Sequence, residues 1–256
     1  MISGWWRRRR EAHTLRTRAI PAGLWRATLL RYPFLAALDA PGQQRLQQMA
    51  ALFLAGKEFT AVGDLRLSDE VAVAIAAQAC LPVLELGLSA YDGFVGIVVH
   101  PDEVVAQRER TDEQGVVHRY EEVLAGEAME GGPVMLSWRD VADAGQTAER
   151  GYNVVIHEFV HVLDMADGAI DGVPPLPDRQ ARLHWRLVME AAYQRFCRAL
   201  ASGHGGFLDP YGAEAIEEFF PVAAEAFFVA PLALRDEQPA LYELFAGYFR
   251  QDPAAR

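Results

Sequence analysis

The chain has 256 residues, of which 51% are hydrophobic, and its formal net charge is −11 at pH 7. This length and composition allow a full core, in one large domain or two tightly packed lobes, without disulfide bonds. The acidic balance argues against a general nucleic-acid binder, because neutralising phosphates requires a basic surface. No stretch reaches transmembrane length and no signal-peptide core follows the basic N-terminus, so we expect a cytoplasmic protein.

The first 90 residues divide into two parts. Residues 1–20 contain an aromatic and basic run, from Trp5 to Arg10, and are expected to form a flexible basic tail. Over residues 21–90, apolar positions recur at helical spacing, which predicts a helical N-terminal region packed on the rest of the protein. The only cysteines, Cys80 and Cys197, lie in apolar stretches and are expected to be reduced thiols.

Short runs rich in β-forming residues follow between about 93 and 137. They cover residues 94–99, 116–120 and 134–138, and they predict a small sheet. We expect the last run to be able to pair, as an edge strand, with an extended peptide. From about residue 147 onward, helical patterns return and continue to the C-terminus.

The first of these later helices carries the only HExxH motif in the chain, from His157 to His161. On a helix, the two histidines lie one turn apart on the same face and can bind one metal ion. Glu158 lies about 100° further round, where it can address a water on the metal. The apolar flanks indicate a buried helix, and a metal ion would offset the desolvation of all three side chains.

This pattern is typical of a zinc hydrolase with one Zn²⁺ per chain; the alternative is a pair of core histidines bonded to neighbours. Strands followed by an HExxH helix and further helices are the usual order of a zincin catalytic lobe. By this analogy of architecture we predict a zincin-like lobe over residues 91–256. The expected fold class is therefore α+β, predominantly helical, with a small sheet.

Catalytic zinc takes three protein ligands, so the chain must supply one more. Asp167 stands where the HExxHxxGxxH pattern places its ligand, but Asp164 occupies the glycine position that this pattern needs. Asp164 is expected instead to orient an imidazole through its free N–H. Glu218 and Glu225 are seven residues apart and share a face of a later buried helix, and spacing alone does not choose between them.

The chain resembles the Mlc titration factor A family of zinc peptidases over most of its length. The segments that carry the resemblance are residues 80–88, 92–94, the HExxH helix with Asp164, 172–174, 209–213 and 218–228. The predicted catalytic lobe also resembles that of anthrax lethal factor. Both resemblances imply a glutamate ligand seven residues after a tyrosine that faces the metal, which is the spacing of Tyr211 and Glu218.

The resemblance implies an aminopeptidase-like metallopeptidase of the gluzincin type that acts on peptides. It makes Glu158 the general base and Tyr211 the residue that assists the oxyanion. Glu225 is then left as a residue that does not bind the metal but contacts its ligands. The implied zinc ligands are His157, His161 and Glu218. The alternative that it implies is a binding protein that sequesters an Mlc-type transcriptional repressor of glucose phosphotransferase regulation, with hydrolysis secondary.

Overall fold

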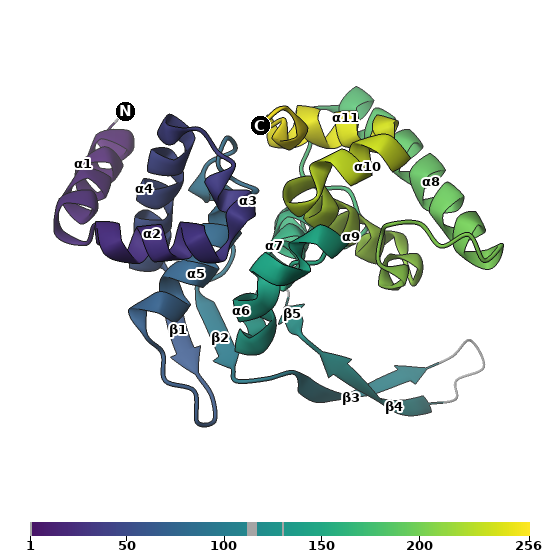
Figure 1. The fold of residues 1–256 in the computed structure, drawn as a ribbon, viewed down its shortest axis with the longest axis horizontal. Coiled ribbons are helices and arrows are strands. Elements are labelled where there is room, and N and C mark those ends of the chain that lie inside the picture. Colours follow the sequence, from purple (N-terminus) through teal and green to yellow (C-terminus); the bar gives the residue numbers. More distant parts are fainter. Residues whose placement is uncertain (1, 112–116, 130) are drawn as a thin grey trace.

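The structure, a computed structural model, describes residues 2–111, 117–129 and 131–256. It is mostly helical, with one mixed four-stranded sheet and one two-stranded antiparallel pair (Figure 1). The predicted α+β class with a predominance of helix is therefore confirmed. No described helix is long and apolar enough to cross a membrane.

The N-terminal region is helical, as expected, but it also contributes a strand. Its helices are α1 (Ile2–Thr17), α2 (Ala22–Arg31), α3 (Pro33–Ala36), α4 (Ala40–Gly56) and α5 (Asp69–Cys80), followed by the short helix η1 (Leu88–Tyr91). Helix α1 occupies most of the segment expected as a flexible tail, and it contacts α4. Leu15, half-buried near its end, packs against the core.

The four-stranded sheet has the order β1 (Glu58–Ala61), β2 (Gly96–His100), β6 (Val134–Ser137) and β5 (Gly126–Ala128). Strand β2 pairs in parallel with β1 on one side and with β6 on the other, whereas β5 pairs antiparallel with β6. The expectation that residues 134–138 form an edge strand is wrong, because β6 has a neighbour on both sides. The edge strand on this side is β5, which the sequence patterns did not predict.

In chain order, a hairpin lies between strands β2 and β5. Strands β3 (Val104–Thr111) and β4 (Val117–Leu124) pair antiparallel and extend away from the helices (Figure 1). Strand β4 contains most of the run predicted over residues 116–120, of which residue 116 lies outside the described residues.

Helices make up most of the second half of the chain. The longer ones are α6 (Trp138–Thr147), α7 (Val154–Asp164), α8 (Arg179–Ala201), α9 (Ile216–Val229), α10 (Pro231–Glu237) and α11 (Pro239–Phe249). Short helices η2 (Ala148–Arg150), η3 (Met165–Asp167), η4 (Pro210–Ala213) and η5 (Pro253–Ala255) lie between or after them.

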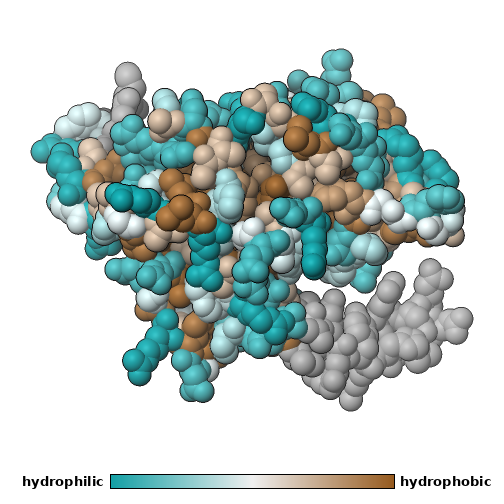
Figure 2. Space-filling view, in the orientation of Figure 1, coloured by the Kyte–Doolittle hydropathy of each residue, from teal (hydrophilic) through white to brown (hydrophobic). Residues whose placement is uncertain are grey.

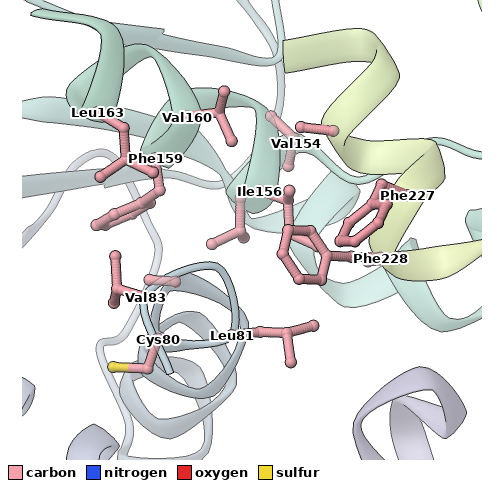
Figure 3. Close-up of a cluster of buried hydrophobic side chains, with 14 of the residues drawn as sticks. Cys80, Leu81, Val83, Val154, Ile156, Phe159, Val160, Leu163, Phe227 and Phe228 are labelled. Carbon is pink, nitrogen blue, oxygen red and sulfur yellow. The ribbon is translucent and has the colours of Figure 1, made fainter. Parts of the chain in front are cut away.

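Helix α7, which carries the HExxH motif, lies in the middle of the core. Figure 3 shows its apolar side chains between the end of α5 and the phenylalanines of α9. The Phe159 ring lies 5.0 Å from Tyr91 and 5.6 Å from both Phe53 and Phe94, measured between ring centroids. Because α7 is packed on several sides, the side chains that it presents to the surface are held on a rigid support.

Candidate functional site

The start of α7 is fixed by a polar contact with the N-terminal region. Asn153 caps the helix, since its Oδ1 accepts a hydrogen bond of 2.9 Å from the Ile156 N–H. Its Nδ2 donates to Gln78 Oε1 at 2.8 Å, and both side chains are fully buried. Helix α5 therefore holds the first turn of α7 directly before His157.

Two histidines of α7 and one glutamate of α9 converge on one point. The ring centroids of His157 and His161 are 4.9 Å apart. Glu218 Oε2 lies 3.3 Å from His157 Nε2 and 3.2 Å from His161 Nε2. Among the described residues, this is the group of three histidine or acidic side chains whose ligand atoms all lie within 4.8 Å of one another. Two imidazole nitrogens and one carboxylate oxygen form a donor set that suits zinc, so these side chains fit a bound metal ion.

The charges around these residues stabilise each other. Burial acts to lower the pKa of His157, but Glu225 and Glu218 beside it outweigh burial and raise the pKa well above its ordinary value. Burial acts to raise the pKa of Glu218, but hydrogen bonds with His157 and His161 hold the pKa below its ordinary value. A divalent cation bound between the histidines and Glu218 could replace the histidine protons that pair with this carboxylate.

Glu225 is more deeply buried than Glu218. Its Oε1 is 2.7 Å from His157 Nδ1, and its Oε2 accepts a hydrogen bond from the Asn153 backbone N–H. When His157 donates from Nδ1 to Glu225, its Nε2 lone pair is left facing Glu218. The structure therefore places the two glutamates, which the spacing could not tell apart, on opposite sides of the same imidazole.

Glu158 faces the cavities beside the histidines. It is only 5% exposed and lines two cavities of about 190 Å³ and 280 Å³. Burial raises its pKa, although His157 and His161 act in the opposite direction. Gly126 of β5 packs directly against it, because a Cβ at this glycine would lie 2.6 Å from Glu158 Cγ. The edge strand therefore passes within contact of the carboxylate.

Tyr211 lines the same two cavities as Glu158. It belongs to η4, where Asp209 Oδ1 accepts a hydrogen bond of 2.9 Å from the Tyr211 backbone N–H. Its ring centroid is 6.0 Å from that of His157, and it lines both cavities. The structure thus brings Tyr211 together with the HExxH residues and Glu218.

Asp164 and Asp167 lie apart from this group. Asp164 is fully buried at the end of α7, and its Oδ2 accepts a hydrogen bond of 2.9 Å from the Gly172 N–H. Its Oδ1 has no hydrogen-bond partner in the described part of the chain, and burial raises its pKa to about 6. The observed hydrogen bond of Asp164 therefore holds a loop rather than an imidazole. Asp167 is exposed in η3 and is not part of the histidine and glutamate group.

Four residues of the site were not predicted from the sequence. They are Gln78, Gly126, Tyr152 and Asn153. Gln78 and Asn153 form the contact between α5 and α7, and Tyr152 lines the smaller cavity. Asn153 could have been found, because an asparagine directly before an apolar helix is a common N-cap. Gln78 and Gly126 gave no local signal, since their roles depend on segments far away in the chain.

Comparison with known proteins gives a family match and several similar relatives. Residues 3–250 match the family described as glucose-regulated metallo-peptidase M90. The chain is 38% identical over 227 residues to Mlc titration factor A of Edwardsiella ictaluri, which covers 88% of this chain and 86% of the relative. It is 36% identical over 230 residues to Mlc titration factor A of Serratia proteamaculans, with coverage of 89% and 87%. A protein of Synechocystis sp. (strain ATCC 27184 / PCC 6803 / Kazusa) is 36% identical over 231 residues, with coverage of 90% and 84%.

The family match covers nearly the whole chain, and the relatives extend over most of their own length. The resemblance to the Mlc titration factor A family is therefore confirmed, and a family of this description points to a metallopeptidase. The chain belongs to the glucose-regulated metallo-peptidase M90 family.

Proposed function

We propose that this protein is a zinc-dependent peptidase that cleaves peptide bonds at the junction of the two cavities. The observation that carries the proposal is the convergence of His157 Nε2 and His161 Nε2 on Glu218 Oε2 beside the buried Glu158. Zinc would be held by these two histidines and Glu218. When bound, it supplies a Lewis acid that activates water and polarises the peptide carbonyl.

The other catalytic tasks fall to side chains of this chain. Glu158 accepts a proton from the attacking water and delivers it to the amine that leaves. The hydroxyl of Tyr211, which lines both cavities, donates a hydrogen bond to the oxyanion of the tetrahedral intermediate. Glu225 holds the imidazole of His157 through Nδ1, which keeps Nε2 directed at the metal position.

The edge strand β5 offers a way to position the substrate. Among the described strands it pairs only with β6, and it passes directly over Glu158. An extended peptide can add to such an edge through backbone hydrogen bonds. This pairing would hold the scissile carbonyl close to Glu158 and Tyr211.

We further propose aminopeptidase-like action. The larger cavity is lined by the acidic residues Glu127, Glu214 and Glu218, and none of its described lining residues is a lysine or arginine. A negatively charged cavity next to the scissile bond attracts the protonated amino terminus of a substrate. Aminoacyl chromogenic substrates are therefore expected to be cleaved faster than the same substrates with a blocked amino group.

The decisive experiment replaces the proposed base, as Glu158→Gln. The variant keeps the size of the side chain but cannot take a proton, so we expect the same zinc content and a loss of about 10²- to 10⁴-fold in kcat. Zinc is quantified by metal analysis, and hydrolysis by a panel of aminoacyl chromogenic substrates and blocked peptides. Full activity in the equally metallated variant would refute the role of Glu158.

A second candidate function is binding of an Mlc-type repressor, with hydrolysis secondary. The names of the relatives from Edwardsiella ictaluri and Serratia proteamaculans favour it, because both are called Mlc titration factors. If binding is the main role, Glu158→Gln should bind the repressor as tightly as wild type while no peptide is cleaved by either. Cleavage of the panel without any measurable repressor binding would favour the peptidase.

A further inference from the structure

Two cavities meet at the proposed catalytic residues. The smaller cavity, of about 190 Å³, and the larger one, of about 280 Å³, share Gly126, His157, Glu158 and Tyr211 as walls. A peptide bond placed at these shared walls has its two flanking residues on opposite sides. Each cavity can therefore receive one of the two side chains next to the bond.

The strand β5 runs from one cavity to the other. The smaller cavity is lined by Ala125 and Gly126, and the larger one by Gly126, Glu127 and Ala128. Antiparallel pairing is the more stable arrangement for a short added strand. A substrate antiparallel to β5 passes Ala128 with its amino-terminal side and Ala125 with its carboxyl-terminal side.

We propose that the smaller cavity is the pocket for the substrate residue directly after the scissile bond, and that it selects an uncharged apolar side chain. This inference rests on the proposed peptidase function and names its specificity. The lining of this pocket includes Ala125, Tyr152, Val154 and Val222.

The apolar residues that line the smaller cavity explain why it should prefer an apolar side chain. Val154 and Val222 are 2% and 3% exposed, and they present aliphatic surface from the first turn of α7 and from α9. Burial, with the nearby Asp140 and Glu225, raises the pKa of Tyr152, so its hydroxyl stays neutral. An apolar side chain gains from burial against these groups.

The acidic groups of the pocket disfavour an acidic substrate side chain. They are Glu158, Asp209 and Glu225, and none of the described lining residues is a lysine or arginine. Both oxygens of Glu225 are already bonded, to His157 and to the Asn153 backbone. A substrate carboxylate in this pocket would lose its hydration beside three carboxylates, none of which can pair with it.

The chain offers a matched pair of variants for a test. Ala125→Leu fills the smaller cavity, and Ala128→Leu adds the same side chain at the other end of β5, facing the larger one. Each protein is assayed with tetrapeptides Ala-Xaa-Ala-Ala, in which Xaa is Gly, Leu, Phe or Asp, and the products are identified by mass spectrometry. Thermal melting and zinc content check that each variant is folded and metallated, and Ala125→Val replaces Ala125→Leu if the latter does not fold.

We expect wild type to cleave before Leu or Phe with a kcat/KM about 10- to 100-fold above that for Gly, and before Asp with a lower value than for Gly. Ala125→Leu should reduce the ratio of Leu to Gly at least tenfold, whereas Ala128→Leu should leave this ratio unchanged. If the ratio responds to Ala128→Leu and not to Ala125→Leu, or if wild type shows no preference after the scissile bond, the assignment is overturned.

A binding measurement separates this inference from the proposed function. Calorimetry compares a hydroxamate chelator carrying an isobutyl group on the adjacent carbon with its unsubstituted parent, on the zinc-loaded protein. Tighter binding of the isobutyl compound, abolished by Ala125→Leu, supports the pocket even if no peptide is cleaved, in which case only the hydrolytic function fails. Equal binding of the two compounds overturns the pocket even if peptides are cleaved.

Discussion

Glu218 and Glu225 are the same residue type on the same face of α9, but they meet different nitrogen atoms of the HExxH helix. Glu218 faces Nε2 of both histidines, whereas Glu225 faces only Nδ1 of His157. The first arrangement suits a metal ligand and the second suits a residue that orients a ligand. Asp164, at the other end of α7, differs from both because its oxygen holds the loop at Gly172.

Glu225→Gln tests the orienting role. Glutamine removes the charge behind His157 and can present its amide nitrogen to Nδ1, so we expect zinc affinity to fall about 10- to 100-fold. Affinity is measured by competition with a chromophoric chelator. The matched control is Glu217→Gln on the same helix, which lies outside the metal-ligating group and should leave zinc affinity unchanged. Equal affinities of both variants would contradict the role of Glu225.

The raised pKa of Asp164 predicts that the stability of the protein depends on pH. Burial raises its pKa from 3.8 to about 6 in the folded protein, with Asp171 adding to the rise and His161 opposing it; the phenol of Tyr248 is also close. Because the folded state holds the proton more tightly, the free energy of unfolding rises as pH falls from 7 towards 4. Relative to Asp164→Asn, wild type should gain up to about 2 kcal/mol over this range.

The measurement is urea denaturation of both proteins at pH 7, 6, 5 and 4, in the presence of a chelator. Other titrating groups are common to the two proteins and cancel in the difference. Asparagine can still accept the Gly172 N–H, so the loop contact is retained. A difference that does not change with pH would show that Asp164 does not titrate in this range.

At the scale of elements, the loop after α7 contacts both helices of the site, α7 and α9. Gly172 donates its N–H to Asp164, and its carbonyl accepts the Trp185 Nε1–H at 2.7 Å. It also packs against the first turn of α9, because a Cβ at this position would lie 3.0 Å from the Ile216 carbonyl oxygen. This glycine therefore helps to set the spacing between α7, which carries both histidines, and α9, which carries Glu218.

Gly172→Ala should disturb this spacing. Gly172 has a φ of +71°, and Gly168, in the same loop, has a φ of +88° but nothing within 4 Å of its Cβ position. Gly168→Ala should cost about 1 to 2 kcal/mol of stability from backbone strain alone. Gly172→Ala should cost more and should also weaken zinc binding, because it presses on the turn that leads to Glu218. Unfolding and zinc titration of the pair give the comparison, and equal effects would contradict this role.

At the scale of the whole molecule, the two halves of the chain form one unit. Strand β1 of the N-terminal region pairs with β2, and α5 packs against α7 while Gln78 holds Asn153. Figure 3 shows the apolar side chains at the same contact, with Cys80, Leu81 and Val83 below the side chains of α7 in this view. On the face shown in Figure 2, hydrophobic residues form small patches among hydrophilic ones, and the large apolar residues of this joint are buried.

The fragment 91–256 should therefore not fold by itself, although it contains every proposed catalytic residue. It would expose the edge of β2 and the apolar face of α7, and it would lose the partner of Asn153. Circular dichroism and limited proteolysis of the fragment test this expectation. A deletion of residues 1–17 serves as the control and should stay folded, since α1 contacts mainly α4. A folded fragment that binds zinc would show that the two parts are separate domains.

Much of the candidate site could be predicted from local patterns. The HExxH helix follows from apolar periodicity, and the shared face of His157 and His161 follows from the geometry of any helix. The resemblance then named Tyr211 and Glu218, and the structure places both beside these histidines. The predicted edge position of residues 134–138 departed from the structure, because strand order is not encoded in a local pattern. The first residues, expected as a tail, contain helix α1.

The sequence by itself determined the α+β class, the buried helix and the pair of imidazoles, since these depend on residues within one or two turns of each other. Only the tertiary structure decided how Glu218 and Glu225 divide around His157, which strand forms the edge, and that Gln78 supports the cap of α7. Each of these depends on the distance between segments separated by tens of residues. Such distances are set by how the helices and strands pack together, and not by the propensities of any one of them.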